Sequence, residues 1–302
     1  MIDKNLEQVP VAATGVETAR STSVSGEDLS TDNVFYIKSG GSRLSVSLTE
    51  LWSYRELLYF LAWRDIKVRY KQTFLGVVWV LLQPILSTLI FTVLFARFAP
   101  AATNEIPYGL FAFCGFVLWT FTSNAITNAG NSLTTNNTLI TKVYFPRLML
   151  PLAAIAASFF DLLLTLAILL VGLLIFARYV SWTIIFAPVF VGLLILLVFG
   201  AGTILAALNV RFRDVRFILP FALQILMFAS PVFYAVDFLP EKARVFWKLN
   251  PLAGILDGFR AAIFGGAWDV LAITISVIFT IFLLIVAIFV FNRMEEDFAD
   301  LI

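Results

Sequence analysis

Six separate stretches of this chain stay apolar for long enough to cross a lipid bilayer, and they constrain the fold more than any other feature. About 20 apolar residues traverse the hydrocarbon of a bilayer. Inside lipid every backbone N–H and C=O group needs a partner within the protein, which an α-helix supplies from its own segment. The sequence therefore predicts an all-α integral membrane protein with six transmembrane helices, at residues 74–96, 109–127, 150–177, 183–208, 217–236 and 270–291.

A seventh apolar stretch, at residues 252–267, is shorter and contains Asp257, Arg260 and several glycines. Irregular backbone at membrane depth is tolerated where protein or water surrounds it. We therefore expect a re-entrant or interfacial hairpin between the fifth and sixth spans, and not a seventh span.

The composition excludes most catalytic chemistry. The 302 residues are 60% hydrophobic and 14% charged, with no histidine and a single cysteine, Cys114. These counts exclude a histidine base, histidine-based zinc centres, a Ser-His-Asp triad and an internal dithiol redox site. The sequence also has no G-x-x-x-x-G-K-[ST] loop for nucleotide phosphates. We expect no catalytic site, cofactor or metal in this chain, and its net charge of +1 gives no indication of a nucleic-acid partner.

The first 50 residues have a different character, with four basic residues against seven acidic ones. Up to about residue 32 they show no apolar periodicity, and they lack the pattern of a cleaved signal peptide. Such a segment buries too little apolar surface to become ordered. We predict a disordered cytoplasmic tail at 1–32, an N-terminal segment at 33–72 and a six-span transmembrane domain at 73–302.

The N-terminal segment is predicted to carry a helix that lies in the membrane interface. Residues 47–50 have the spacing of a capping box. Residues 51–71 then combine aromatic rings with bases, and Arg64, Lys67 and Lys71 fall on one helical stripe beside Arg69. An amphipathic helix of this kind is typical of the interface. The alternative is a charged flank that only fixes the topology.

Basic residues in the flanks of the spans predict the orientation. Cytoplasmic flanks carry an excess of Lys and Arg. With six spans, eleven basic residues fall on one side and six on the other. The richer side is predicted to be cytoplasmic, which places both termini inside the cell.

A polar connection at 128–147 follows the second predicted span. Amides and hydroxyls alternate there with a few apolar residues, which suits a short helix that docks into a groove of a cytoplasmic partner. An ordinary solvated connector is the alternative. Arg211 and Arg213, at the end of the fourth span, form a second candidate contact. The predicted docking residues of the connection are Asn131, Leu133, Asn136, Asn137, Leu139 and Lys142.

Asp161 is the only acidic residue well inside a predicted span. Ionisable groups at such positions are costly and often functional. Asp161 could serve ion-coupled transport, or it could be a structural partner of a neighbouring helix. Aromatic residues, at 15% of the chain, could face lipid, pack between helices or line a path for sugars.

Several motifs, in order along residues 33–302, resemble the permease subunits of ABC-type polysaccharide exporters, which carry O-antigen, capsule or teichoic acid. The residues that carry the resemblance are LWSYRELL at 51–58, WRDIKVRYK at 63–71, LITKVYFPR at 139–147, NVRFRDVR at 209–216, SPV at 230–232 and NPL at 250–252.

The resemblance implies a homodimer in the bacterial inner membrane that pairs with two copies of a cytoplasmic ATPase, which binds the ATP and magnesium. The implied substrate is a polysaccharide on a polyprenyl diphosphate, and O-antigen is the favoured one. The 128–147 connection would dock on the ATPase. The helix at 51–71 would be the interfacial gate helix, and its Arg64, Lys67 and Arg69 would attract the diphosphate. Residues 237–268 would form outward-side re-entrant helices between the fifth and sixth spans. The channel would be lined by the aromatic residues Phe74, Trp79, Phe116, Trp119, Phe221, Phe228 and Tyr234.

Three other functions stay open at this point. A related ABC permease could move a small lipid or drug. A membrane-embedded polyprenyl-phosphate enzyme could use Arg211, Arg213 and Asp214, and a secondary transporter could rely on Asp161.

Overall fold

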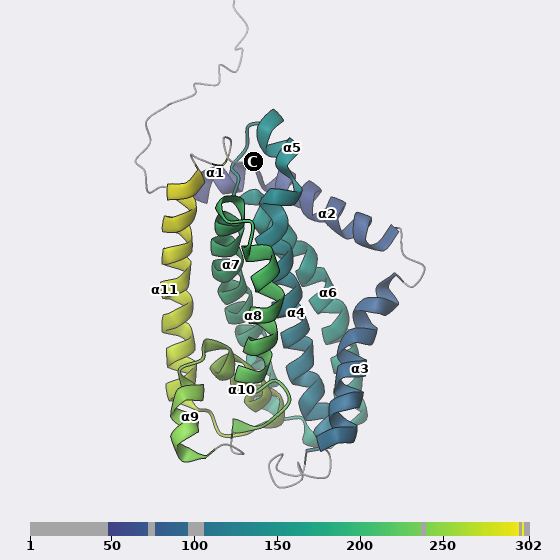
Figure 1. The fold of residues 1–302 in the computed structure, drawn as a ribbon. Coiled ribbons are helices and arrows are strands. Elements are labelled where there is room, and N and C mark those ends of the chain that lie inside the picture. The colour runs from purple at the N-terminus through teal and green to yellow at the C-terminus, as the bar shows by residue number, and fades with distance from the viewer. Residues whose placement is uncertain (1–47, 72–75, 96–105, 237–239, 296–297, 299–302) are drawn as a thin grey trace, which may run out of the picture. The chain divides into compact units, whose positions relative to one another are not determined.

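The computed structural model of the chain describes residues 48–71, 76–95, 106–236, 240–295 and 298. All regular secondary structure within these residues is helical, which confirms the all-α prediction (Figure 1). The predicted tail at 1–32 and Phe74 lie outside the described residues. The α-helices are α1 (Leu48–Ser53), α2 (Arg55–Lys71), α3 (Val77–Phe95), α4 (Tyr108–Thr135), α5 (Asn137–Lys142), α6 (Met149–Ile175), α7 (Ala187–Arg211), α8 (Val215–Ala229), α9 (Glu241–Lys248), α10 (Pro251–Phe264) and α11 (Val270–Glu295).

Two short 3-10 helices, η1 (Ala177–Tyr179) and η2 (Trp182–Phe186), join α6 to α7. Within the described ranges, five helical segments are long and apolar enough to cross a bilayer: α3, α4, α6, α7 with η2, and α11. Each of them overlaps one predicted span. The sequence therefore predicted these five spans correctly, because their apolar length alone identifies them.

The fifth predicted span, at 217–236, is not confirmed as a helix of spanning length. The helix that forms there, α8, has 15 residues and ends at Ala229. At 1.5 Å per residue it is ~22 Å long, whereas the hydrocarbon layer is ~30 Å thick. The helix stops because Pro231 has no N–H to continue the ladder. The chain turns instead, and the Val232 N–H donates to the Ser230 carbonyl at 2.7 Å.

α4 is the best-buried of the spanning helices. It packs against α3, α6, α7 and α10, and its buried face contributes Cys114, Val117 and Leu118 to the larger of two apolar cores. Small residues let α7 come close to it, since a Cβ on Gly202 would lie 2.7 Å from the Cβ of Ala129. α3, in contrast, lies at the periphery and buries Pro84 alone of its described residues.

Helices gather differently at the two ends of the bundle, as Figure 1 shows: α5 lies at one end with α1 and the start of α2, and α9 and α10 lie at the other. A second apolar core occupies the α5 end. It joins Leu61 of α2 to Leu133, Ile140 and Phe145 around α5, and to Phe291 of α11. α8 runs between the two ends, from the end of α7 toward α10.

Candidate functional site

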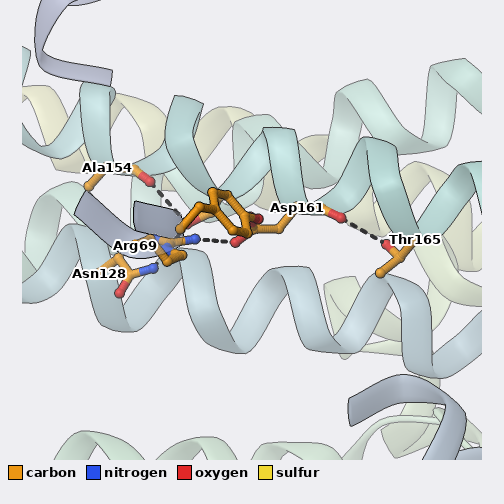
Figure 2. A network of polar contacts seen from close by, with 7 residues as sticks. Arg69, Asn128, Ala154, Asp161 and Thr165 are labelled. Carbon is orange, nitrogen blue, oxygen red and sulfur yellow. Dashed lines mark hydrogen bonds and ion pairs between the residues drawn. The ribbon is translucent and has the colours of Figure 1, made fainter. Parts of the chain in front are cut away.

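The strongest polar site in the described residues lies where α2 meets α6. Asp161 projects from the buried face of α6. Arg69 of α2 forms an ion pair with it, and the Tyr70 hydroxyl donates a hydrogen bond to its other carboxylate oxygen. Figure 2 shows Arg69 reaching Asp161, between Asn128 of α4 and Thr165 of α6. The Asp161 side chain is 9% exposed and that of Arg69 is 30% exposed.

Hydroxyl and amide groups extend this site along α6. The Thr165 hydroxyl donates to the Leu162 and Asp161 carbonyls at 2.9 and 3.2 Å. One turn before Asp161, the Ser158 hydroxyl donates to the Ala154 carbonyl and accepts from the Asn128 amide, both at 3.0 Å (Figure 2). The result is a polar seam that joins α2, α4 and α6.

Tyr70 acts as a donor in this site at neutral pH. Burial raises the pKa of its hydroxyl above the ordinary value, and the hydrogen bond to Asp161 and the negative charge of Asp161 raise it further. Since the hydroxyl keeps its proton, Asp161 receives a positive charge and a neutral donor together. A buried acid without such partners would be unfavourable by several kcal/mol.

The sequence did not identify these partners. The resemblance implies that Arg69 attracts a diphosphate, and Tyr70 is one of the aromatic rings of the predicted interfacial helix. The pairing favours the structural interpretation of Asp161, because Arg69 and Tyr70 together contact both oxygens of its carboxylate.

The other two predicted gate cations lie in different surroundings. The Arg64 guanidinium donates to Asp65 Oδ1 from Nε at 3.0 Å and from Nη2 at 2.8 Å. Its Nη2 also donates to Asn136 Oδ1 at 2.8 Å. Lys67 is exposed on the same helix. The three predicted cations therefore do not form one cluster of exposed charge.

The predicted docking connection is largely helical. Residues 128–135 continue α4, which ends two turns later than the sequence predicted, and Asn136 separates α4 from the short helix α5. The Asn136 amide donates to the Ser132 carbonyl at 2.8 Å and so closes the end of α4. Six amide and hydroxyl side chains of this segment bond to its own helical backbone: Asn131, Ser132, Thr134, Asn136, Asn137 and Thr141.

The predicted docking residues divide between the two sides of this segment. Leu133 is fully buried, and Leu139 packs against the second core. Asn131 is half-buried and accepts a hydrogen bond from Asn209 of α7 at 3.0 Å. Asn137 and Lys142 are exposed.

The most exposed large side chain near α5 is one that the sequence analysis did not single out. Tyr144 is 85% exposed, and Val143 beside it is exposed as well. The signal was present in the sequence, as an aromatic residue within the LITKVYFPR motif. Arg211 and Arg213 are exposed at the end of α7, where the Arg211 guanidinium lies 5.7 Å from the centre of the Phe212 ring.

The predicted channel aromatics do not form a single surface in one copy of the chain. Trp79, Phe221 and Phe228 are exposed, whereas Phe116 and Trp119 are buried in the larger core. Tyr234 is half-buried; its hydroxyl donates to the Phe228 carbonyl at 2.9 Å and accepts from the Trp247 indole. Phe116 packs on Phe91 of α3 at 5.2 Å between ring centres, so it joins helices.

A cavity of about 640 Å³ lies at the opposite end of the bundle, between α9, α10 and the start of α11. Trp247, Asp257 and Trp268 are among its lining residues. A 2.7 Å ion pair between Lys248 and Asp269 ties α9 to α11 beside it.

Comparisons with known proteins identify the family of this chain. A family model described as ABC-2 type transporter matches residues 56–264, from α2 to the end of α10. An O-antigen export system permease protein of Myxococcus xanthus is 29% identical over 254 residues, which are 83% of this chain and 97% of that protein. Another, from Klebsiella pneumoniae, is 28% identical over 250 residues, 82% of this chain and 95% of that protein.

A capsule polysaccharide export inner-membrane protein of Neisseria meningitidis is 22% identical over 230 residues, 72% of this chain and 83% of that protein. These matches confirm the resemblance that the sequence motifs indicated. The family model covers well over half of the chain, and the apolar helices are those of a multi-pass membrane protein. The chain belongs to the ABC-2 type transporter family of membrane proteins.

Proposed function

We propose that this chain is the membrane permease of an ATP-driven exporter. The exporter moves a polyprenyl-diphosphate-linked polysaccharide outward across the bacterial inner membrane, and O-antigen is the favoured substrate. The observation that carries the proposal is the similarity to O-antigen export permeases over 97% and 95% of their own lengths. Two copies of the chain would form the path, and two copies of a cytoplasmic ATPase would supply the energy.

The α5 end of the bundle is the proposed docking site for the ATPase. α5 is a six-residue helix, and Asn137, Lys142 and Tyr144 are exposed on or beside it. Arg211 and Arg213 are exposed at the end of α7, at the same end of the bundle (Figure 1). In this proposal the α5 end is cytoplasmic, as the excess of basic residues predicts, and both termini are inside the cell.

α8 is proposed as the fifth of the six spans. It runs between the two ends of the bundle but is too short to cross the hydrocarbon alone (Figure 1). The turn at Ser230, Pro231 and Val232 continues the crossing beyond the end of α8. Its irregular backbone is tolerated at membrane depth because protein buries it. α9 and α10 would then be the outward-side re-entrant helices.

We keep Lys67 as the proposed contact for the lipid diphosphate, because it is exposed on α2. Arg64 and Arg69 each have protein partners, so their positive charges are partly neutralised in this arrangement. Trp79, Phe221 and Phe228 are the proposed lining of the path, because they are exposed on α3 and α8.

The proposal is tested in inverted membrane vesicles that carry the chain, its ATPase and radiolabelled lipid-linked glycan. We expect glycan to become protected inside the vesicles when ATP is supplied, and to do so equally after a protonophore has dissipated the proton gradient. Accumulation that follows the proton gradient without ATP would make the chain a secondary transporter. Transport of a lipid or drug without glycan would favour the related ABC permease.

The contribution of Lys67 is tested by Lys67→Gln, with Lys242→Gln on α9 as the matched loss of an exposed positive charge at the other end. A basic residue near an anionic membrane surface contributes about 1 kcal/mol, or roughly a fivefold change in affinity. We expect the concentration of lipid-linked glycan at half-maximal export to rise about fivefold in Lys67→Gln and to stay unchanged in Lys242→Gln. Equal values in the two variants would contradict the assignment.

A further inference from the structure

α2 is attached to the bundle by two polar contacts that lead to two different elements. Arg64 donates to Asn136, between α4 and α5. Arg69 and Tyr70, in the last turn of α2, bond to Asp161 of α6. The two attachments are five residues apart, or ~7.5 Å along the helix axis. Leu61, about one turn before Arg64, packs into the second core and holds the N-terminal half of α2 there.

The attachment to Asp161 is suited to stay fixed. The carboxylate is buried, and separating it from Arg69 would leave a buried charge without a counter-ion. Breaking one partner away from a buried ion pair is among the more costly changes in a protein. α6 is also a long helix that packs against α4 and α7, so it offers a rigid support.

The attachment to Asn136 is suited to transmit movement. Asn136 belongs to neither α4 nor α5 but separates them, and it is half-buried, whereas Asp161 is buried. The Asn136 carbonyl accepts from the Leu139 and Ile140 N–H groups of α5 at 3.0 and 3.3 Å, so a displacement of α5 acts on Asn136 directly. Because α5 is the proposed contact for the ATPase, the residue beside it is the first that a push on α5 would move.

We propose that α2 acts as a lever, held at its C-terminal end by Asp161 and moved near its middle by Asn136 through Arg64. The inference rests on the proposed function, which supplies the push on α5. Asp161, Arg64 and Asn136 are then positioning residues: they place α2 and its exposed Lys67 without touching the substrate. Asp161 serves as an anchor and not as a carrier of protons.

The movement is measured as a distance between spin labels at Phe60→Cys on α2 and Leu163→Cys on α6, in a Cys114→Ala background. Phe60 and Leu163 are exposed, whereas Cys114 is buried. The full exporter, permease with ATPase, is placed in lipid nanodiscs with and without a non-hydrolysable ATP analogue. In the chain without further substitutions we expect the distance to change when the nucleotide binds.

Arg64→Gln and Asn136→Ala are each expected to remove more than half of this change. The double variant is expected to match the single ones, because both substitutions remove the same Arg64–Asn136 hydrogen bond. Asn136→Asp, which keeps an acceptor for Arg64, is expected to retain the change. Asp161→Asn is expected to broaden the distance distribution even without nucleotide.

Export per ATP is expected to fall about tenfold in Arg64→Gln, within the usual range for coupling between sites. ATPase co-purification stays unchanged.

Arg55→Gln is the control, because Arg55 is exposed on the same helix and bonds to the Trp52 carbonyl nearby. A nucleotide-dependent change that survives in Arg64→Gln overturns the lever, and so does an unchanged distance in the protein without further substitutions. Glycan export by that protein, measured in the vesicles above, decides separately whether the proposed function stands.

Discussion

Arg260 shows how one residue holds together the end of the bundle where α9 and α10 lie. Its guanidinium is buried, donates to the carbonyls of Pro231 and Val232, and lies 3.8 Å from the centre of the Phe111 ring. Asp257 lies 3.6 Å away as its counter-ion. The turn that ends α8 has no helix ladder of its own, so Arg260 supplies the donors that the turn requires.

Arg260→Lys is expected to destabilise the protein, because an ammonium cannot serve two carbonyls and a ring face in the same geometry. An unsatisfied buried carbonyl costs about 1–3 kcal/mol, which lowers the melting temperature in detergent by roughly 5 °C. Arg178→Lys is the control, since Arg178 is exposed and stacks on Tyr179. Equal melting temperatures for the two variants would contradict this function of Arg260.

Gly115 of α4 permits the same turn to approach. A Cβ at this position would overlap the Val232 carbonyl and the Arg260 guanidinium, whereas a Cβ on Gly192 of α7 would meet no atom within 4 Å. We therefore expect Gly115→Ala to lower the melting temperature and Gly192→Ala to leave it unchanged or raise it, because alanine favours a helix over glycine by about 1 kcal/mol. A thermal scan of both variants in one detergent measures the difference. A loss in Gly192→Ala alone would refute the argument.

At the scale of elements, α5 has an inner and an outer side. Ile140 and Leu139 pack into the second core, whereas Thr138 and Lys142 are exposed, with Tyr144 just beyond the helix. Substitution of Leu139 therefore changes the core of the permease before it changes any partner contact. Tyr144 is a better probe of docking, because its side chain touches little of its own chain.

Tyr144→Ala is expected to abolish co-purification of the ATPase while the melting temperature of the permease stays the same. Central aromatic residues of an interface contribute 2 kcal/mol or more, which is about a 30-fold loss of affinity. Leu139→Asp is expected to lower the melting temperature, because it puts a charge into an apolar core. Normal yield of the ATPase with Tyr144→Ala would place the docking surface elsewhere.

The elements that the sequence predicted correctly are those whose signal is local. Five spans follow from apolar length, and the helical position of Lys67 follows from its spacing. The end of α8 was predicted seven residues too late, because apolar residues on both sides of Pro231 outweighed the break. The partners of Asp161 were not predicted at all: Arg69 lies 92 positions away, and only the packing of α2 on α6 brings the two together.

At the scale of the whole molecule, the two ends of the bundle differ in chemistry. The α5 end joins polar contacts on α2, α4 and α6 to exposed bases on α7. The opposite end has a cavity between α9, α10 and the start of α11, and tryptophans and charged residues line it. A permease that receives a push at one end and releases a polymer at the other requires such an asymmetry. Between the ends, α3, α8 and α11 expose large apolar side chains, and these faces meet either lipid or a second copy of the chain.

Single cysteines distinguish the two kinds of face. If the path lies between two copies, Phe221 on α8 faces the second copy, whereas Phe282 on α11 faces lipid. The two residues form a matched pair, because both are phenylalanines and their exposures are 65% and 59%. In a Cys114→Ala background, oxidation of native membranes is expected to cross-link Phe221→Cys into dimers and to leave Phe282→Cys monomeric. Cross-linking of Phe282→Cys alone would place the second copy against α11 and would remove Trp79, Phe221 and Phe228 from the lining of the path.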